Sequence, residues 1–348
     1  MAFAVDNLAE VRKAVNVCTM CGFCKSVCPS FKAIGWDTAL SRGRITLTYG
    51  LLNGDIEADP SVVENMYTCT TCADCVRRCP SKVNIVDIIE LCRADLVKNG
   101  KMLPKHKGMC ENILKYGNPF AETASREETL GRKPHNAKIG YYVGCTATYR
   151  SKKTAQATLS ILDKLDDDYT TIDEVCCGSV MQRVGWPQED VTELFKKNVE
   201  AIKALGVETL VLACAGCYRM FKIEYPKYVD VPFEVLHITE YLAKKDLKLK
   251  PMEGVVATYH DPCHLGRHCD VFEPPREVIK KIPGLDYREM QYNRKTSHCC
   301  GGGGGVNLAT DVDAPHVALL VLEEVVLTED AGFLGIAVGL GGGNDVGR

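Results

Sequence analysis

The sequence has 348 residues, of which 46% are hydrophobic and 25% charged, and these proportions exclude a disordered chain. Its 42 Lys and Arg residues nearly balance 45 Asp and Glu residues, and this lack of a basic excess argues against nucleic-acid binding. No stretch reaches the roughly 20 apolar residues of a membrane-spanning helix, and the first residues are too acidic for a signal peptide. We therefore expect a cytoplasmic protein without a transmembrane segment, which would reach a membrane only through a partner.

The chain contains 19 cysteines. Small secreted proteins use many cysteines as a disulfide framework, but such chains are short and carry a signal peptide. In a cytoplasmic chain of this length, so many thiols instead indicate metal binding, redox chemistry or both.

One cysteine pattern occurs twice within residues 1–100. Its copies are Cys18-x2-Cys21-x2-Cys24-x3-Cys28-Pro29 and Cys69-x2-Cys72-x2-Cys75-x3-Cys79-Pro80. This is the pattern of bacterial two-cluster ferredoxins, in which the fourth cysteine of each run ligates the cluster of the other run. The predicted ligands of the two [4Fe-4S] clusters are therefore Cys18, Cys21, Cys24 and Cys79 for the first, and Cys69, Cys72, Cys75 and Cys28 for the second. Zinc is the alternative, but zinc sites favour CxxC pairs separated by a loop.

A helix is predicted after the second run, over IVDIIELCRADLV. Cys92 lies in this helix in phase with Ile85, Ile88 and Ile89, so we interpret it as a buried core thiol and not as a ligand. Residues 101–138 are predicted to connect the N-terminal domain to the rest of the chain, because Pro and Gly interrupt any long periodicity. Cys110, within this connector, receives no role.

Two segments then repeat one theme, which indicates an internal duplication. Each opens with a short apolar run that ends at a cysteine, IGYYVGC at Cys145 and VVATYHDPC at Cys263. Each then passes through helical stretches to a Cys-Cys-Gly, at Cys176-Cys177-Gly178 and at Cys299-Cys300-Gly301. We place the first Cys-Cys-Gly module at residues 139–245 and the second at residues 246–348.

Strands and helices alternate within the first module. Apolar residues from Val191 to Leu205 follow helical spacing and predict a helix. The run VETLVLAC then predicts a buried strand that ends at Cys214. A further strand over Phe233–His237 leads into the predicted helix ITEYLAKK. This alternation predicts α/β layers with parallel strands, whose carboxyl ends would bring the cysteines to one edge of the sheet. The predicted fold is mixed α+β and α/β, with a mainly helical two-[4Fe-4S] ferredoxin-like domain followed by two duplicated α/β cysteine-rich modules.

The first module has five cysteines that could act together, namely Cys145, Cys176, Cys177, Cys214 and Cys217. Five thiols with one adjacent pair do not suit a four-ligand cubane, whereas they could serve a more open cluster with bridging thiolates. A structural zinc site and a vicinal disulfide are the alternatives.

The second module lacks part of this set. Cys263, Cys299 and Cys300 are present, but no cysteine follows Cys300, and IAVGLGGG stands where a matching CxxC is expected near residues 337–340. We hypothesise either true divergence or an altered C-terminus such as a frameshift, and Cys269 is a poor substitute by position. The run Gly301–Gly305 lacks the Gly-Lys-Ser/Thr ending of a phosphate-binding loop, so we interpret it as close backbone packing around a site.

Together these motifs resemble a known family. The Cys-Cys-Gly modules look like the cysteine-rich domains of the B subunit of heterodisulfide reductase, and the N-terminal runs look like the ferredoxin-type C subunit of that enzyme. Fused in this order they resemble the D subunit of heterodisulfide reductase, to which the iron–sulfur subunits of glycolate, D-lactate and anaerobic glycerol-3-phosphate dehydrogenases are related. The resemblance covers about residues 8–306 and includes Ser41-Arg42-Gly43-Arg44-Ile45, His237-Ile238-Thr239-Glu240 and Asp261-Pro262-Cys263-His264.

In that family each complete module binds a noncubane [4Fe-4S] cluster, and a disulfide is cleaved between two such clusters. By position, the resemblance implies one noncubane cluster on Cys145, Cys176, Cys177, Cys214 and Cys217, and an incomplete second site on Cys263, Cys299 and Cys300. It further implies that electrons enter the two cubanes and reduce a disulfide, for which the family precedent is the coenzyme M–coenzyme B heterodisulfide.

Electron entry requires a partner, because no GxGxxG follows a strand and no CxxCH occurs, so no flavin or haem is expected in this chain. A flavoprotein or a membrane cytochrome is the expected donor. The rival hypothesis is a non-catalytic electron conduit for a flavin-dependent glycolate, lactate or glycerol-3-phosphate dehydrogenase, which the incomplete second module favours. A third hypothesis is that the chain is a structural or regulatory module in an electron-bifurcating complex.

Two histidines and two arginines complete the predicted site. His264 and His298 flank the cysteines of the second module and could donate protons to a leaving thiolate; local hydrogen bonding is the simpler role for each. His298 could also supply a missing ligand. Arg42 and Arg44 could offset negative cluster charge, or they could form an ordinary solvated or salt-bridged pair.

Overall fold

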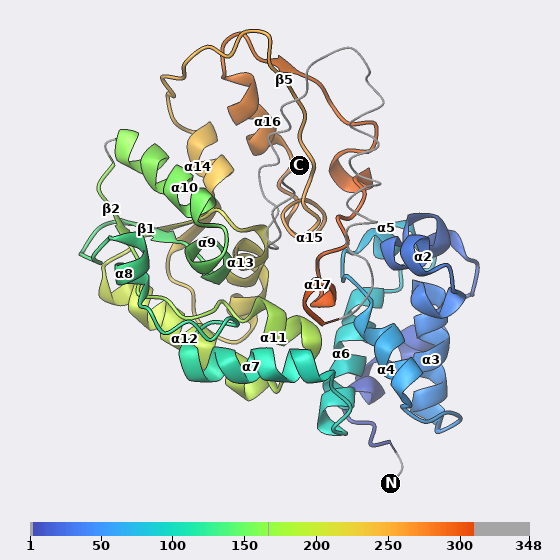
Figure 1. Cartoon of the computed structure of the whole chain (residues 1–348). Helices are drawn as coiled ribbons and strands as arrows, with labels where there is room; N and C mark the ends of the chain where they lie inside the picture. Colours follow the sequence, from blue (N-terminus) through green and yellow to red (C-terminus); the bar gives the residue numbers. More distant parts are fainter. Residues whose placement is uncertain (1–2, 166, 310–348) are drawn as a thin grey trace. The chain divides into compact units, whose positions relative to one another are not determined.

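The computed structural model of the protein describes residues 3–165 and 167–309, and these residues form two compact units (Figure 1). The first unit combines three separate stretches of chain: the residues up to Cys110, Val180–Val191, and the described residues from Tyr292 onward. The second unit comprises Glu111–Ser179 and Thr192–Gln291. Helices α7 (Pro104–Tyr116), α11 (Ser179–Val184) and α12 (Gln188–Ala204) contain residues of both units.

Among its described residues the first unit contains helices and no strand, which confirms the mainly helical character predicted for the N-terminal region. Besides its parts of α7, α11 and α12, its α-helices are α1 (Arg12–Asn16), α2 (Pro29–Ile34), α3 (Ser41–Asn53), α4 (Pro60–Tyr67), α5 (Asp74–Arg78), α6 (Ile85–Lys98) and α17 (Val306–Ala309). Short 3-10 turns occupy Asn7–Val11, Phe23–Val27, Asp37–Ala39 and Arg294–Thr296.

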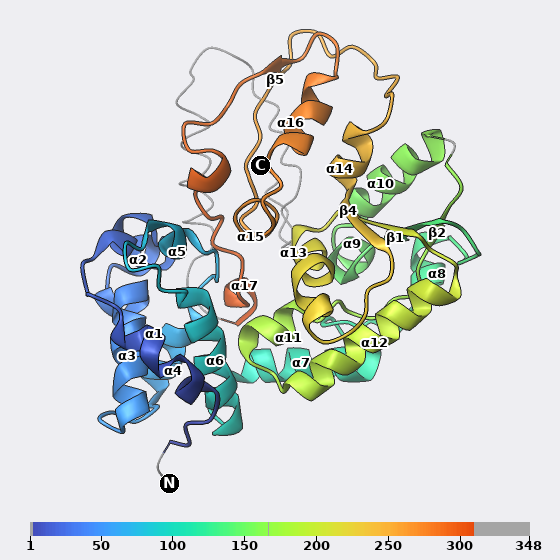
Figure 2. The same ribbon diagram turned by 180° about the vertical axis from the view of Figure 1, so that it is seen from behind.

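Helices α3, α4 and α6 lie side by side and enclose the apolar core of this unit (Figures 1 and 2). Asp59 starts α4 by accepting hydrogen bonds from the backbone N–H groups of Ser61 and Val62, with Pro60 in the first turn. The predicted burial of Cys92 on α6 is confirmed, because its thiol is fully buried. The buried Asp95 carboxylate accepts hydrogen bonds from three successive backbone N–H groups, from Asp6 to Leu8, and so fixes the N-terminal segment against α6.

The second unit alternates strands and helices. Its strands are β1 (Ile139–Tyr142), β2 (Tyr169–Thr171), β3 (Thr209–Leu212), β4 (Glu234–His237), β5 (Val256–Ala257) and β6 (Asp286–Tyr287). Besides its parts of α7, α11 and α12, its helices are α8 (Arg126–Leu130), α9 (Cys145–Tyr149), α10 (Lys152–Lys164), α13 (Ala215–Arg219), α14 (Ile238–Ala243), α15 (Gly266–Cys269) and α16 (Glu273–Lys280). A π-helical turn over Met220–Glu224 and a 3-10 turn over Tyr225–Lys227 follow α13.

Four of the strands form one sheet in the order β2-β1-β3-β4, and every neighbouring pair is parallel. Ile139 of β1 pairs with Tyr169 of β2 on one side and with Thr209 of β3 on the other. The predicted strands that end near Cys214 and at His237 are therefore confirmed, as is their parallel arrangement. Because the connection after β1 leads to β2 on one side and the connection after β3 leads to β4 on the other, the gap between β1 and β3 is the topological switch point at which such sheets carry their sites.

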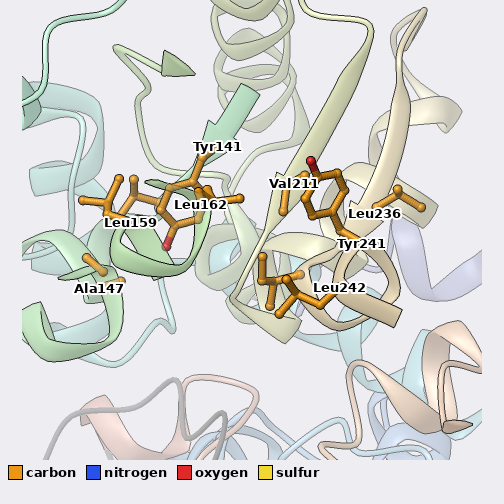
Figure 3. Close-up of a cluster of buried hydrophobic side chains, with 11 residues drawn as sticks. Tyr141, Ala147, Leu159, Leu162, Val211, Leu236, Tyr241 and Leu242 are labelled. Atoms are coloured by element: carbon orange, nitrogen blue, oxygen red, sulfur yellow. The ribbon is translucent and has the colours of Figure 1, made fainter. Parts of the chain in front are cut away.

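Both faces of this sheet are covered by helices, with α10 and α14 on one side and α12 on the other (Figures 1 and 2). On the first side, strand residues such as Tyr141 and Val211 pack with Leu162 of α10 and Leu242 of α14 (Figure 3). The neighbour of Tyr141, Tyr142, points to the opposite face, as the two-residue period of a strand requires. Its ring meets Phe221 edge-on at a centroid distance of 4.9 Å. Burial on both faces explains why the two central strands, β1 and β3, consist mostly of apolar residues.

The second module begins like the first. Strands β5 and β6 form a parallel pair in which Val256 lies opposite Asp286, just as β1 pairs with β2. This shared opening is consistent with the duplication that the sequence indicates. The position near residues 337–340, where a matching CxxC is expected, lies outside the described residues. Among the residues that the structure does describe, no helix is long and apolar enough to span a membrane.

A buried histidine makes the stability of the first unit dependent on pH. His106 of α7 is fully buried, and its Nε2 donates a hydrogen bond to the carbonyl oxygen of Gly305 at 2.8 Å. Its Nδ1 is buried without a hydrogen-bond partner among the described residues. Protonation would therefore bury a charge together with an unsatisfied N–H, and burial lowers the pKa of His106 to about 4.

Acid is therefore expected to destabilise the first unit through His106. The unfolded chain takes up a proton near pH 6.5, whereas folded His106 stays neutral down to about pH 4, so the unfolded state binds more protons between these values. The free energy of unfolding should fall as the pH drops through this window, by on the order of 3 kcal/mol. Thermal unfolding at pH 7.5 and pH 5 measures the loss.

The variant His106→Gln keeps a side-chain donor for Gly305 but cannot titrate, so its unfolding temperature should fall less between the two pH values. His135→Gln is the control, because His135 is exposed and should leave the acid response unchanged. Equal acid sensitivity of wild type and His106→Gln would exclude His106 as the cause.

Candidate functional site

Two pockets in the first unit are each walled by four cysteines. We call them the first cysteine pocket, lined by Cys18, Cys21, Cys24 and Cys79, and the second cysteine pocket, lined by Cys28, Cys69, Cys72 and Cys75. Each run thus supplies three cysteines to one pocket and its fourth to the other, which is the grouping expected from the spacing. Within the described residues, no three His, Cys, Asp or Glu side chains meet so as to hold a metal ion. A multi-iron cluster differs from a single metal ion, because it occupies a pocket between its cysteines.

The backbone adopts the same conformation around both pockets. Met20 and Gly22 in the first run have φ values of 55° and 83°, and Thr71 and Ala73 occupy the same positions of the second run with φ values of 52° and 63°. A β-branched residue such as Thr71 is costly in this left-handed region, by about 1–3 kcal/mol. Such strain at matched positions is typical of backbone that wraps around a bound group.

Buried thiols of these runs have raised pKa values. Burial raises the pKa of Cys28 and of Cys75, so their thiolate forms need a positive group or a metal nearby. Arg44 lines the second cysteine pocket, and its buried guanidinium donates to the Asn65 carbonyl oxygen and to Thr68 Oγ1, each at 2.7 Å. Arg42 lines the first cysteine pocket but also forms a partly exposed ion pair with Asp37.

The glycine run packs directly against the second cysteine run. A Cβ atom on Gly304 would lie 2.4 Å from the carbonyl oxygen of Cys69, and Gly304 has a φ of 64°, so only glycine fits there. This confirms that the run serves close backbone packing. Cys299 Sγ lies 3.5 Å from Thr70 Oγ1, which places the Cys299-Cys300 pair beside the second cysteine pocket, within the same unit. A hydrogen bond from the Cys299 thiol lowers the pKa of Cys300 to about 7.

In the second unit, cysteines follow the carboxyl ends of three neighbouring strands. Cys145 opens α9 after β1, the Cys176-Cys177 pair follows β2, and Cys214 and Cys217 flank the start of α13 after β3. The thiols form a continuous chain of hydrogen bonds, from Cys145 to Cys176, Cys177, Cys217 and Cys214. The structure therefore brings all five predicted cysteines together at the β1/β3 switch point.

Hydrogen bonds between these thiols give them different pKa values. Cys176 donates to Cys177 and Cys217 donates to Cys214, and each acceptor has its pKa lowered to about 6. Hydrogen bonding to Cys177 and Cys214 raises the pKa of Cys217. Two of the five sulfurs are thus favoured as thiolates near neutral pH, the form in which cysteine binds metals.

A buried ion pair supports this cluster of thiols. The guanidinium of Arg126 lies 3.3 Å from the carboxylate of Glu174, and it also donates to Cys145 Sγ at 3.4 Å. Glu174 accepts hydrogen bonds from the backbone N–H groups of Val143 and Gly144, so it fixes the turn that presents Cys145. Burial raises the pKa of Glu174, and the guanidinium of Arg126 opposes this rise. Sequence reasoning missed both charged residues, although Glu174 stands just before the Cys-Cys-Gly motif and offered a signal.

Cysteines assigned to the second module fall into different units. Cys263 is buried in the second unit, where Arg276 holds the preceding turn through two hydrogen bonds to Asp261 at 2.7 Å each. Cys299 and Cys300 belong to the first unit. His264 lies beside His268 with ring centroids 5.1 Å apart, and His298 stacks on Tyr292 at 4.4 Å. The proton-donor role of either histidine stays a prediction.

Comparison with known proteins accounts for both parts of the chain. Residues 14–83 match the 4Fe-4S dicluster domain, and residues 139–222 and 257–328 match the cysteine-rich domain known as CCG. The D subunit of the dihydromethanophenazine:CoB–CoM heterodisulfide reductase of Methanosarcina acetivorans is 39% identical over 350 residues, covering 91% of this chain and 84% of the relative. The chain belongs to the family of heterodisulfide reductase D subunits. It is therefore an iron–sulfur oxidoreductase subunit.

Other relatives are longer proteins that match this chain over part of their length. The B subunit of the fumarate reductase (CoM/CoB) of Methanothermobacter marburgensis is 38% identical over 252 residues, covering 70% of this chain and 50% of the relative. The EtfAB:quinone oxidoreductase of Syntrophomonas wolfei is 31% identical over 264 residues, covering 70% of this chain and 37% of the relative. The likeness thus extends beyond heterodisulfide reductases to proteins whose names describe other electron acceptors.

The packing of the glycine run against the second cysteine pocket predicts unequal effects of two alanine substitutions. Gly304→Ala forces a Cβ into the Cys69 carbonyl at a positive φ, so it should lower the free energy of unfolding by more than about 1 kcal/mol. Gly302→Ala is the matched control, because the nearest atom to its Cβ would be 3.9 Å away. Thermal unfolding under anaerobic conditions measures both, and equal stability of the two variants would contradict the packing.

Proposed function

We propose that this chain passes electrons through two [4Fe-4S] clusters to a noncubane-type cluster that reduces a disulfide. The observation that carries the proposal is the meeting of Cys145, Cys176, Cys177, Cys214 and Cys217 at the switch point of the sheet. Membership of the family of heterodisulfide reductase D subunits supports the same function, since the name of the relative in Methanosarcina acetivorans joins CoB and CoM in a heterodisulfide.

The two cysteine pockets suit the proposed cubanes. Each offers four thiols on a strained, wrapping backbone, and each has an arginine in its wall. Cysteine thiolates are the usual ligands of [4Fe-4S] clusters, and the crossover of the fourth cysteine brings two such clusters close to one another. In this proposal Cys18, Cys21, Cys24 and Cys79 hold one cluster, and Cys69, Cys72, Cys75 and Cys28 hold the other.

The five thiols of the second unit suit a more open cluster. Their linked hydrogen bonds mean that adjacent sulfurs can share one group, whereas a cubane needs one separate sulfur at each of four corners. When bound, such a cluster would supply the electrons that break the disulfide. Arg126 donates to Cys145 Sγ, so it would stabilise negative charge on that sulfur. The second site, with Cys263, Cys299 and Cys300, has too few cysteines in the sequence to repeat this set.

The overall reaction consumes a disulfide, two electrons and two protons and yields two thiols. His264 and His298 remain our proposed proton donors, because an imidazole can give up a proton near neutral pH. The electrons would come from a flavoprotein or a membrane cytochrome, and the proposed substrate is the coenzyme M–coenzyme B heterodisulfide. The relative from which this substrate is taken is itself named as one subunit of an enzyme, which supports action within a complex.

A second function is favoured by the run IAVGLGGG, which stands where a matching CxxC is expected near residues 337–340. Without a complete second module, the chain would conduct electrons for a flavin-dependent glycolate, lactate or glycerol-3-phosphate dehydrogenase and would not cleave a disulfide itself. Its similarity to an EtfAB:quinone oxidoreductase supports this alternative.

The two functions differ in one assay. Anaerobically purified chain with its clusters in place is given reduced benzyl viologen, and dye oxidation is followed after addition of the coenzyme M–coenzyme B heterodisulfide. Disulfide reduction predicts dye oxidation that depends on the heterodisulfide. Cys177→Ser should abolish it by removing a central thiol of the five, with a loss of at least about tenfold.

Cys92→Ser is the matched control, because Cys92 is buried in α6 away from both pockets and its replacement keeps the size of the side chain. Its activity should stay within twofold of wild type. A chain that holds its clusters but oxidises dye only with a flavoprotein and a hydroxyacid would reject disulfide reduction and select the second function.

A further inference from the structure

One arginine that sequence reasoning overlooked occupies the centre of the first unit. Arg93 of α6 is fully buried, with none of its surface exposed. It follows Cys92 and lies one helical turn after Ile89, in phase with the apolar face of α6. A charged residue at such a position was a signal in the sequence, because α6 otherwise presents apolar side chains there.

All five N–H groups of the Arg93 guanidinium donate to backbone carbonyl oxygens. Nε and Nη2 both bond to the carbonyl of Met66, at 3.0 Å and 2.7 Å, and Nη2 also bonds to that of Cys69 at 2.7 Å. Nη1 bonds to the carbonyls of Arg183 and Gly304, at 2.7 Å and 3.0 Å. The donors of the side chain are therefore fully used, and they join the loop before the second cysteine pocket, α11 and the glycine run.

The positive charge of Arg93 is not neutralised by a carboxylate that hydrogen-bonds to it among the described residues. The carboxylate of Glu90, on the same helix, is instead taken by Arg183 at 2.6 Å. Burying a guanidinium without a counter-charge is costly.

We propose that Arg93 is a positioning residue that raises the reduction potential of the cluster in the second cysteine pocket. This inference rests on the proposed cluster ligands. Reduction adds one negative charge to a cluster whose thiolates already make the pocket anionic. A fixed cation attached to the Cys69 carbonyl stabilises that added charge, and the dry surroundings keep the interaction strong.

The geometry also gives Arg93 a purely structural role, from which the electrostatic role can be separated. The five hydrogen bonds would hold the three stretches of chain together whatever the pocket contains. Lysine keeps the positive charge but loses the planar fork of donors, whereas glutamine loses the charge. A structural role predicts that both variants are impaired in stability alone, while the electrostatic role predicts a change of potential in the glutamine variant only.

The experiment is an EPR-monitored redox titration of the two cubane signals in the full chain. In Arg93→Gln, one cubane should become harder to reduce by at least tenfold in its equilibrium constant, about 59 mV for a one-electron couple, while the other stays unchanged. Arg93→Lys should restore the midpoint potential of the affected cubane to within that margin. Lys98→Gln is the matched control, because Lys98 lies on the same helix with an exposed side chain paired to Asp6, and it should shift neither signal.

Unchanged potentials in Arg93→Gln would overturn the inference, and so would equal shifts of both cubanes. If Arg93→Gln fails to assemble, Arg93→Met takes its place, because it also removes the charge: a tenfold shift of one cubane supports the electrostatic role, and unchanged potentials reject it. Wild-type protein without any cubane signal would instead remove the proposed function itself. The two failures are therefore distinguishable.

Discussion

A single buried guanidinium joins the three separate stretches of chain that form the first unit. Arg93 binds the carbonyls of Met66 and Cys69 in the first stretch, of Arg183 in the second and of Gly304 in the third. Only arginine has enough donors in one plane to do so. Because one of its partners is a cysteine that lines the second pocket, the interaction that assembles this unit also fixes the wall of the proposed cluster site.

In the second unit, buried ion pairs hold the turns that carry cysteines. Arg126 and Glu174 support the turn before Cys145, and Arg276 with Asp261 supports the turn before Cys263. Each pair is buried and shares its remaining hydrogen bonds with backbone or neighbouring side chains, which is the condition under which a buried charge is tolerated. In both units, buried arginines therefore fix the loops that carry cysteines, and the apolar core holds the elements between them.

Much of this arrangement could be predicted from sequence because its signals are local. The spacing of the cysteine runs predicts their grouping, the apolar runs predict β3 and β4, and glycines at consecutive positions predict close backbone contact. Arg93 and Arg126 could not be assigned in this way, because their partners lie far along the chain, up to the 211 residues that separate Arg93 from Gly304. The Cys299-Cys300 pair shows the same limit. Motif repetition groups it with Cys263, whereas packing against Thr70 assigns it to the first unit.

The central claim is that the chain holds a disulfide-reducing cluster besides its two cubanes. Iron and acid-labile sulfide per chain, measured on anaerobically purified protein together with EPR before and after addition of coenzyme M or coenzyme B thiol, tests it most directly. The account predicts about twelve irons or more, and an EPR signal of the oxidised protein that depends on the added thiol. About eight irons with no thiol-dependent signal would mean that only the cubanes are present, and this result would contradict the account.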